Sequence, residues 1–254
     1  MLSSLCSFLP SSAEISGRYI DPFVGGAAVF FYVRPRRALL SDINADLIDL
    51  YMTLRHHPSE TWDQCGLDPS RLDAPTRAAR LLYLSRTCFK GMWRHNKKGQ
   101  FNVGYGGESR RWVVTRRELQ DASRMLRSAD LRCGDFEPIL DEAKRGDFVF
   151  LAPPYRPGAK RMHNAHYVAH EFGYSDQVRL AHALERASDR GIRWTMTNSA
   201  HADILSLYQG HFVVTMDAGT GSRPGLISRA GGEAVILSQG PNTHPFSTPW
   251  ASTL

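Results

Sequence analysis

The four residues 152–155, Ala-Pro-Pro-Tyr, directly follow an apolar run that has the composition of a buried strand. Prolines cannot continue a hydrogen-bonded ladder, so Pro153 and Pro154 must take the chain out of the sheet at that point. There they would hold a backbone carbonyl in a fixed place, together with the ring of Tyr155 as a stacking platform. The alternative is an ordinary proline-rich loop with a half-buried tyrosine.

A glycine pair, Gly25 and Gly26, follows another short apolar run, at residues 18–23. Glycine lets a ligand approach the backbone, and the helix that follows would present its N-terminus to that ligand. The next apolar run, residues 37–44, contains Asp42 at its end, ~20 residues further on, where an acid in a doubly wound sheet binds the two hydroxyls of a ribose. The alternatives are a plain turn for the glycines and a helix cap for Asp42.

A third run ends in Cys-Gly-Asp-Phe, which puts Asp135 and Phe136 at the end of another predicted strand. There a carboxylate can accept a hydrogen bond from an adenine amino group, and an aromatic ring can stack on the adenine. Ligands bind beyond the carboxyl ends of parallel strands, so one nucleoside-containing cofactor would contact all three of these sites.

The elements that position these residues alternate between strand and helix along the chain. Helices are predicted after the glycine pair and at residues 45–54, 137–144 and 175–188, and further strands at residues 130–136, 147–152, 192–199 and 233–238. This alternation predicts an α/β fold, a doubly wound and mostly parallel sheet with helices on both faces. Residues 52–130 change to a helical, charge-rich and turn-rich composition, so we expect an insert there, with residues 1–51 and 131–254 forming the sheet domain.

Within the expected insert, basic side chains alternate with Phe89, Trp93 and Phe101. This mixture suits phosphate contacts combined with a stacking or intercalating ring. The formal net charge of +6 also favours a polyanionic partner such as nucleic acid. The alternative is a solvated face with no partner. The basic residues concerned are Arg86, Lys90, Arg94, His95, Lys97 and Lys98.

Composition sets the remaining limits. The chain has 254 residues, of which 42% are hydrophobic, enough to bury a substantial core, so disorder is excluded as its main state. The four cysteines show neither disulfide-like nor zinc-like spacing, which fits a reducing cytoplasm. No apolar segment approaches the ~18 residues needed to cross a bilayer. We therefore expect a cytoplasmic monomer that has no membrane span and no metal site.

Taken in order, these segments resemble the Dam-type, or D12 class, adenine-N6-specific DNA methyltransferases. DPFVGGAAVFF is similar to the family's loop for S-adenosylmethionine (AdoMet), SDIN to its ribose acid, CGDF to its adenine site, APPY to its catalytic motif and TNS to its late strand. The long stretch SRTCFKGMWRHNKKGQFNVGYG is similar to its target-recognition signature and is the most specific match. The resemblance spans nearly the whole chain and implies a class I AdoMet-dependent methyltransferase sheet with an antiparallel final strand.

The resemblance also implies roles for individual residues. Methyl would pass from AdoMet to adenine N6 in a short duplex DNA site, GATC by family default, after the base is flipped out. Arg94 and Asn96 would lie in the base-contacting segment, and Lys97 and Lys98 would hold phosphates. The implied cofactor-binding residues are Asp21, Phe23, Gly25, Gly26, Asp42, Asp135 and Phe136, the catalytic positions are Ala152, Pro153, Pro154 and Tyr155, and the DNA-binding set is completed by Arg86, Lys90 and Asn102.

The sequence departs from the family pattern at three places. Ala152 stands where the family has the aspartate of Asp-Pro-Pro-Tyr, the family's Gly-Gly-Lys segment is not found, and Gly104 replaces a common proline. The family aspartate accepts a hydrogen from the adenine amine, so we expect its loss to slow catalysis by about 100-fold to 1,000-fold while AdoMet and DNA still bind. The alternatives are a non-catalytic AdoMet- and DNA-binding protein and, disfavoured by the insert, an enzyme acting on RNA or a small molecule.

Overall fold

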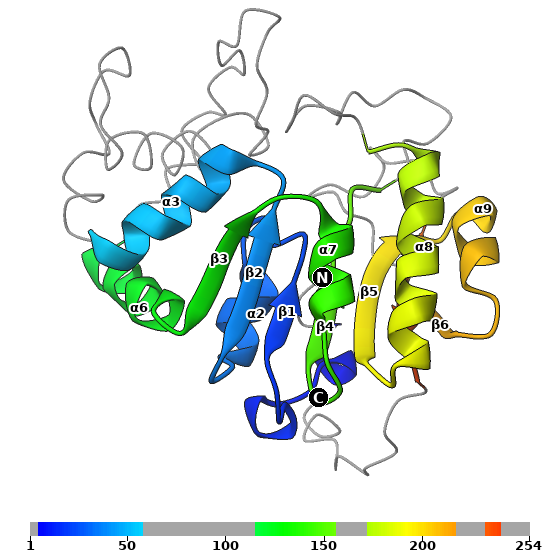
Figure 1. Ribbon diagram of the computed structural model, residues 1–254, viewed down its shortest axis with the longest axis horizontal. Helices are drawn as coiled ribbons and strands as arrows, with labels where there is room; N and C mark the ends of the chain where they lie inside the picture. The colour runs from blue at the N-terminus through cyan, green and yellow to red at the C-terminus, as the bar shows by residue number, and fades with distance from the viewer. Residues whose placement is uncertain (1–4, 58–114, 156–171, 217–231, 240–254) are drawn as a thin grey trace, which may run out of the picture.

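The computed structural model describes residues 5–57, 115–155, 172–216 and 232–239. These residues form a seven-stranded sheet in the order β3-β2-β1-β4-β5-β7-β6 (Figure 1). The five strands from β3 to β5 pair in parallel, while β7 pairs antiparallel with both β5 and β6. The predicted α/β fold, with a mostly parallel sheet and an antiparallel final strand, is confirmed.

The elements lie within a few residues of their predicted positions in the part of the chain that is described. The strands are β1 (Tyr19–Asp21), β2 (Ala38–Asp42), β3 (Ala129–Cys133), β4 (Phe148–Leu151), β5 (Arg193–Ser199), β6 (Phe212–Met216) and β7 (Glu233–Leu237). The helices are α2 (Ala28–Val33), α3 (Ala45–His56), α6 (Arg116–Leu126), α7 (Phe136–Glu142), α8 (Tyr174–Asp189) and α9 (Ala202–Leu205), with 3-10 turns at Cys6–Phe8, Ser12–Glu14 and Ser206–Tyr208.

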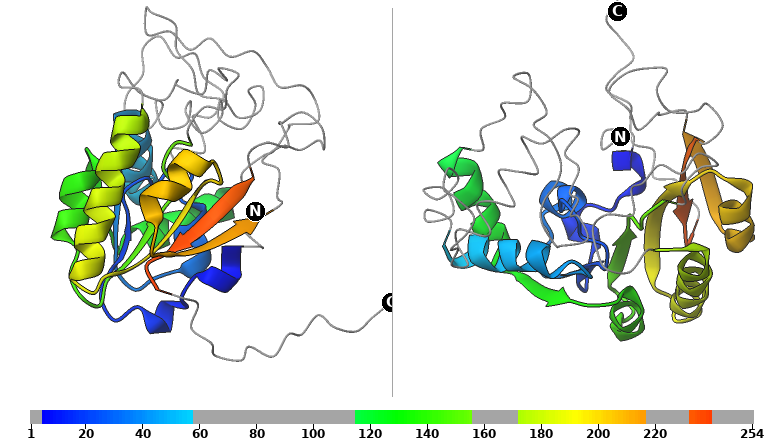
Figure 2. Two further views of the ribbon diagram at one scale, coloured as in Figure 1. Left: turned by 90° about the vertical axis from the view of Figure 1, so that its right-hand side faces the viewer. Right: turned by 90° about the horizontal axis from the view of Figure 1, so that it is seen from above.

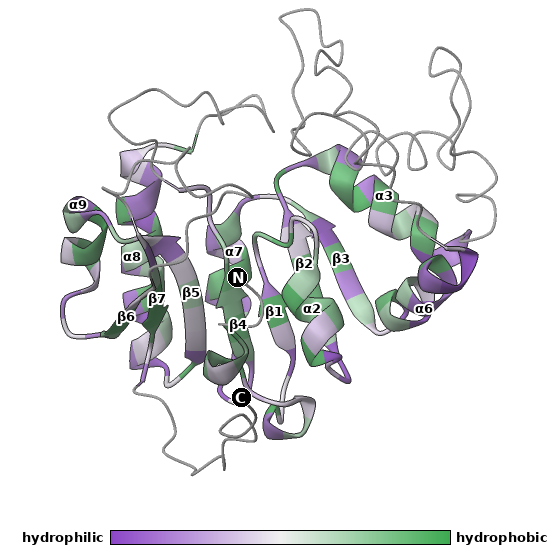
Figure 3. Ribbon diagram, turned by 180° about the vertical axis from the view of Figure 1, so that it is seen from behind, coloured by the Kyte–Doolittle hydropathy of each residue, from purple (hydrophilic) through white to green (hydrophobic). Residues whose placement is uncertain are grey.

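Helices cover both faces of the sheet. The buried residues of α2, α3 and α6 pack in one core, and those of α7, α8 and α9 pack in the other. Figure 1 shows α7 and α8 in front of the sheet. Figure 3, which views the molecule from behind, shows α2 on the opposite face, and the right-hand view of Figure 2 shows the two layers from above. Neighbouring strand residues face opposite cores, as Leu39 and Leu40 do. Because both faces are covered, the central strands are nearly continuous apolar runs.

The expected domain boundaries fall inside elements of the sheet domain. Residue 52 lies within α3, which continues to His56, and residue 130 lies within β3. The hydroxyl of Ser123 on α6 donates to the carbonyl of Arg55 at 2.8 Å, and Arg55 Nη1 donates to the carbonyl of Ala129 at 3.0 Å. These contacts tie both flanks to the sheet. We therefore propose that the insert is confined to residues 58–114, which lie outside the described residues.

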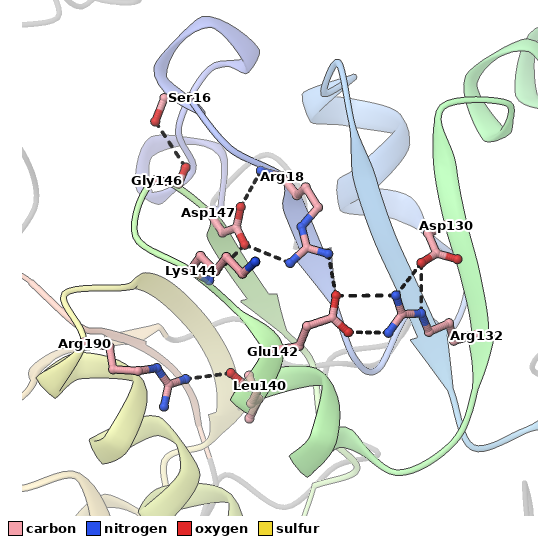
Figure 4. A network of polar contacts seen from close by, with 10 residues as sticks. All are labelled: Ser16, Arg18, Asp130, Arg132, Leu140, Glu142, Lys144, Gly146, Asp147 and Arg190. Atoms are coloured by element: carbon pink, nitrogen blue, oxygen red, sulfur yellow. Dashed lines mark hydrogen bonds and ion pairs between the residues drawn. The ribbon is translucent and has the colours of Figure 1, made fainter.

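An ion-pair network joins residues that precede β1 and β4 to the end of α7 and to β3 (Figure 4). Arg18, which precedes β1, pairs with Glu142 at 2.7 Å and with Asp147 at 3.2 Å. Arg132 on β3 also pairs with Glu142, and with Asp130 at 2.6 Å. Hydrogen bonds from Arg132 and Arg18 lower the pKa of the Glu142 carboxyl to about 2. The network therefore links the starts of β1 and β4 with β3 and the end of α7.

Candidate functional site

The carboxyl ends of four neighbouring strands carry the predicted site residues. Asp42 ends β2 and Asp21 ends β1, while Asp135 lies just beyond β3 and Ala152 directly follows β4. These strands are parallel and adjacent in the order β3-β2-β1-β4, so their ends lie along one edge of the sheet (Figure 1). A parallel sheet brings all its carboxyl ends to the same side, which places these residues at one edge.

The glycine turn after β1 is held by the acid at the end of β2. Gly25 has a φ of +44°, a conformation that glycine adopts without strain. Its backbone N–H donates to Asp42 Oδ2 at 3.1 Å, and the N–H of Asn44 donates to Asp42 Oδ1 at 3.0 Å. The hydroxyl of Tyr51 on α3 donates to the Gly25 carbonyl at 2.6 Å. The N-cap of α3 is Asn44, so the helix-cap reading of Asp42 is wrong.

Open space borders this turn. A Cβ added at Gly26, or at Gly134 between β3 and Asp135, would meet no heavy atom of the described residues within 4 Å. Packing among those residues therefore does not demand glycine at either position. Ile43, directly after Asp42, is 47% exposed at the same edge. Sequence reasoning missed Ile43, although an apolar residue beside a ribose acid is a pattern that could have pointed to it.

Asp21 is buried beneath the turn. Its carboxylate accepts hydrogen bonds from the Tyr19 hydroxyl at 3.1 Å and from the Phe23 N–H at 3.2 Å. Burial, together with repulsion from nearby Asp42, raises the pKa of Asp21 to about 7. Burial also raises the pKa of Asp42. Two carboxyls with raised pKa at one strand edge favour a positively charged neighbour, which would stabilise their ionised forms.

Asp135 and Phe136 are already engaged by a side chain from α8. Asp135 caps α7 by accepting from the Glu137 N–H at 2.9 Å, and it also accepts from Arg179 Nη2 at 2.7 Å. The Arg179 guanidinium lies 4.5 Å above the centre of the buried Phe136 ring. The Phe23 ring packs against the Phe136 ring, with 5.3 Å between the two ring centres. Arg179 therefore makes the two contacts expected of an adenine, and no sequence signal pointed to it.

The Ala-Pro-Pro-Tyr turn leaves the sheet after the fully buried strand β4. Ala152 is exposed and Tyr155 is half-buried. The Tyr155 hydroxyl donates to Glu233 Oε1 of β7 at 3.4 Å, and burial raises the pKa of Tyr155 to about 12. Burial raises the pKa of Glu233 as well. The Pro154 carbonyl accepts a hydrogen bond from Gln177 Nε2 of α8 at 2.9 Å. Sequence reasoning missed both Glu233 and Gln177.

The structure does not describe the predicted DNA-binding residues. The DNA-binding candidates Arg86, Lys90, Arg94, Asn96, Lys97, Lys98 and Asn102 all fall in residues 58–114, outside the described ranges. Among the described residues, no three His, Cys, Asp or Glu side chains gather as a metal site would require. No helix in that same part of the chain is both long enough and apolar enough to span a membrane.

The sheet order and the acids along its carboxyl edge define a class I methyltransferase fold. The chain also matches the family model of the D12 class N6 adenine-specific DNA methyltransferases over residues 1–71 and 67–218. The match covers most of the chain. The protein therefore belongs to this family and is, by family, an adenine-specific DNA methyltransferase.

Curated relatives agree with this assignment. The chain is 30% identical to the type II methyltransferase M.MjaIII of Methanocaldococcus jannaschii, over 76% of this chain and 78% of that protein. It is 31% identical to the type II methyltransferase M1.LlaDCHI of Lactococcus lactis subsp. cremoris, over 81% and 80% respectively. It is 29% identical to a DNA adenine methylase of Vibrio cholerae, over 80% and 78% respectively.

Proposed function

We propose that this chain binds AdoMet at the carboxyl edge of its sheet and methylates N6 of a flipped adenine in duplex DNA, slowly because residue 152 is alanine. The observation that carries the proposal is that Asp42, Asp135 and the Pro-Pro-Tyr turn lie along one edge of a sheet with the strand order of class I methyltransferases. An acid for a ribose, an acid for an adenine and a turn for the target base would then stand in one row.

The residues at this edge fit AdoMet. The Asp42 carboxylate would hold the ribose hydroxyls through the lone pairs that its backbone hydrogen bonds leave free. Gly26 and Gly134 border open space among the described residues, and the exposed Ile43 offers an apolar surface beside Asp42. When bound, AdoMet supplies an electrophilic methyl group on a positively charged sulfur. That charge suits the raised pKa of Asp21, because a nearby cation favours the carboxylate form.

The adenine part of the cofactor has a competitor. Arg179 lies over Phe136 and binds Asp135, so an adenine that used both residues would displace Arg179 or share Asp135 with it. The Asp135–Arg179 ion pair is partly exposed, and such pairs contribute little to stability. Displacing Arg179 from Asp135 would therefore cost little free energy compared with the other contacts that the ligand makes.

The target amine needs acceptors for its hydrogens, because its lone pair is delocalised into the adenine ring. We assign one acceptor to the Pro153 carbonyl, the backbone acceptor next to residue 152; the Pro154 carbonyl already accepts one hydrogen bond from Gln177. Ala152 cannot supply the second acceptor, and losing one positioned acceptor costs about 100-fold to 1,000-fold in turnover. The ring of Tyr155 would stack on the flipped base. Lys97, Lys98 and their neighbours would hold the duplex through its phosphates.

A second candidate function is favoured by the same alanine. A chain that lacks the acceptor at residue 152 can keep its cofactor and DNA sites, and it would then act as a non-catalytic AdoMet- and DNA-binding protein. Ala152 is exposed at the end of β4, so its presence leaves no buried charge unpaired. Binding alone therefore does not separate the two candidates, whereas turnover does.

The deciding experiment compares the parent with Ala152→Asp. Transfer of tritiated methyl from AdoMet to unmethylated genomic DNA should rise by about 100-fold to 1,000-fold in the variant. The dissociation constants for AdoMet and DNA should stay within about twofold, because the exposed strand end accepts a carboxylate without repacking. Ala202→Asp, at another exposed alanine, is the control and should leave transfer unchanged.

The other outcomes are equally informative. Strong and equal transfer by the parent and by Ala152→Asp would show that another group accepts the amine hydrogens. No transfer by either protein, with both ligands bound, would favour the non-catalytic reading.

A further inference from the structure

Two buried side-chain amides connect the Pro-Pro-Tyr turn to the body of the domain. Asn198, on β5, is 0% exposed, and Gln177, in the first turns of α8, is 1% exposed. The backbone N–H of Ser199 donates to Asn198 Oδ1 at 2.8 Å, and Asn198 Nδ2 donates to Gln177 Oε1 at 3.0 Å. Gln177 Nε2 then donates to the Pro154 carbonyl at 2.9 Å. These three bonds form an amide relay from β5 through α8 to the turn.

The direction of this amide relay is set by its two ends. The Ser199 N–H can only donate, so the Asn198 oxygen must face it, and the Asn198 NH₂ must then face the Gln177 oxygen. The Gln177 NH₂ is left to point at the turn, where the Pro154 carbonyl can only accept. Neither proline has an N–H with which the turn could reverse the pattern. Each amide thus has one orientation that satisfies all its partners.

The amide relay acts on the peptide that carries Tyr155. The Pro154 carbonyl lies in the same planar peptide unit as the Tyr155 nitrogen, so holding the carbonyl fixes the plane from which Tyr155 departs. Proline rings fix φ at residues 153 and 154, and the rotation left at Pro154 is the one that this hydrogen bond restrains. At its far end the Tyr155 hydroxyl meets Glu233. The ring is therefore held at both its backbone and its hydroxyl.

We infer that Gln177 and Asn198 are positioning residues for the methyl-transfer reaction: their amide relay holds Tyr155 where it can stack on the target adenine. The inference rests on the proposed function for the role of Tyr155, while the positioning itself is a property of the free protein. The inference also assigns a role to the segment Thr-Asn-Ser, residues 197–199, which resembles the family's late strand and contains Asn198.

The first test follows Tyr155 in the free protein. The chain is produced with 3-fluorotyrosine, and the ¹⁹F signal of Tyr155 is identified by its loss in Tyr155→Phe. Gln177→Met keeps the length of the side chain but cannot donate to the Pro154 carbonyl, so the Tyr155 signal should shift and broaden. Ser188→Ala removes a different α8–β5 bond, from Trp194 Nε1 to Ser188 Oγ at 2.9 Å, and should leave the signal unchanged.

Gln177→Glu provides a conservative variant that protonation can rescue. A protonated glutamic acid can accept from Asn198 and donate to Pro154, as glutamine does, whereas a carboxylate would face the Pro154 carbonyl with a second acceptor. Burial raises the pKa of such an acid. Charged or titratable groups on the same elements are Asp176 and Arg179 of α8, of which Arg179 pairs with both Asp176 and Asp135, and Tyr155, whose hydroxyl donates to Glu233. The Tyr155 signal should match the parent at pH 5.5 and the Gln177→Met variant at pH 8.

The second test measures methyl transfer in the Ala152→Asp protein. Adding Gln177→Met should lower kcat by about tenfold, the effect of one lost hydrogen bond, with the AdoMet dissociation constant unchanged. Adding Ser188→Ala should leave kcat unchanged.

Three results would overturn the inference. These are an unmoved Tyr155 signal in Gln177→Met, a Gln177→Glu signal that is displaced equally at both pH values, or a Ser188→Ala signal that moves as far as that of Gln177→Met. If the ¹⁹F results are as expected but Ala152→Asp transfers no methyl, positioning stands and the proposed function fails. If the Ala152→Asp protein is active and adding Gln177→Met leaves its kcat unchanged, the amide relay positions Tyr155 but does not contribute to catalysis.

Discussion

The backbone N–H of Gly25 donates to the carboxylate of Asp42 at 3.1 Å, which joins the end of β2 to the glycine turn after β1. The same carboxylate accepts from the Asn44 N–H, so Asp42 orders both the turn and the start of α3. One acid therefore has a structural task and, in our proposal, a ribose to bind. A variant at this position should affect both.

Asp42→Ala should weaken AdoMet binding by about tenfold or more, because hydrogen bonds to a charged group are lost and the Gly25 turn is released. Asp42→Asn should weaken it less, since its amide oxygen can still accept from one of the two backbone N–H groups. Asp189→Ala, at an exposed acid that ends α8, is the control. Titration calorimetry measures all three, and an unchanged affinity in Asp42→Ala would refute the ribose assignment.

Arg179→Gln should tighten AdoMet binding by about twofold to fivefold, because a partly exposed ion pair worth at most about 1 kcal/mol no longer competes for Asp135. Arg186→Gln is a matched control, since Arg186 lies on the same helix and pairs with Glu137 and Asp141 but not with Asp135. Weaker binding by Arg179→Gln would mean that Arg179 is itself a part of the cofactor site.

Lys97→Ala combined with Lys98→Ala should make DNA binding less dependent on salt. Each phosphate contact removed lowers the slope of log K against log salt by about 0.9, so two contacts should lower it by about 1.8. Arg36→Ala combined with Arg37→Ala removes two exposed charges at the start of β2, at the opposite edge, and should change the slope little. Fluorescence anisotropy across a salt series gives the slopes. If removing Lys97 and Lys98 changes neither the DNA affinity nor the slope, these two residues lie on a solvated face that does not contact DNA.

Glu142→Gln should destabilise the fold at pH 7 by up to about 1 kcal/mol, the range for partly exposed ion pairs. The pKa of Glu142 falls from its ordinary 4.5 to about 2 on folding, so its stabilisation is present above pH 4.5 and is lost as the pH falls toward 2. The difference between parent and variant in urea unfolding should therefore shrink over that range. Glu185→Gln, at an exposed glutamate on α8, is the control, and a difference that does not vary with pH would contradict the ion-pair explanation.

The sequence determined the fold class and the row of residues along one edge. Apolar runs that end in glycine, aspartate or proline mark where strands stop, and strands that alternate with helices must run in parallel. Parallel strands bring their carboxyl ends together, so the sequence alone predicts that Gly25, Asp42, Asp135 and residue 152 share one edge of the sheet. The order of the motifs was also enough to point to the family.

Only the tertiary structure decided which partners those residues have. Arg179 covers Phe136 and binds Asp135 from a helix 44 residues away along the chain, and Tyr155 meets Glu233 across 78 residues. Asp21 proved to be a buried acid under the turn, with a pKa of about 7. Periodicity shows which face of an element is apolar, but polar contacts form over ~3 Å and depend on how elements pack. That packing made Gln177 and Asn198, unremarked as single letters, the support of the Pro-Pro-Tyr turn.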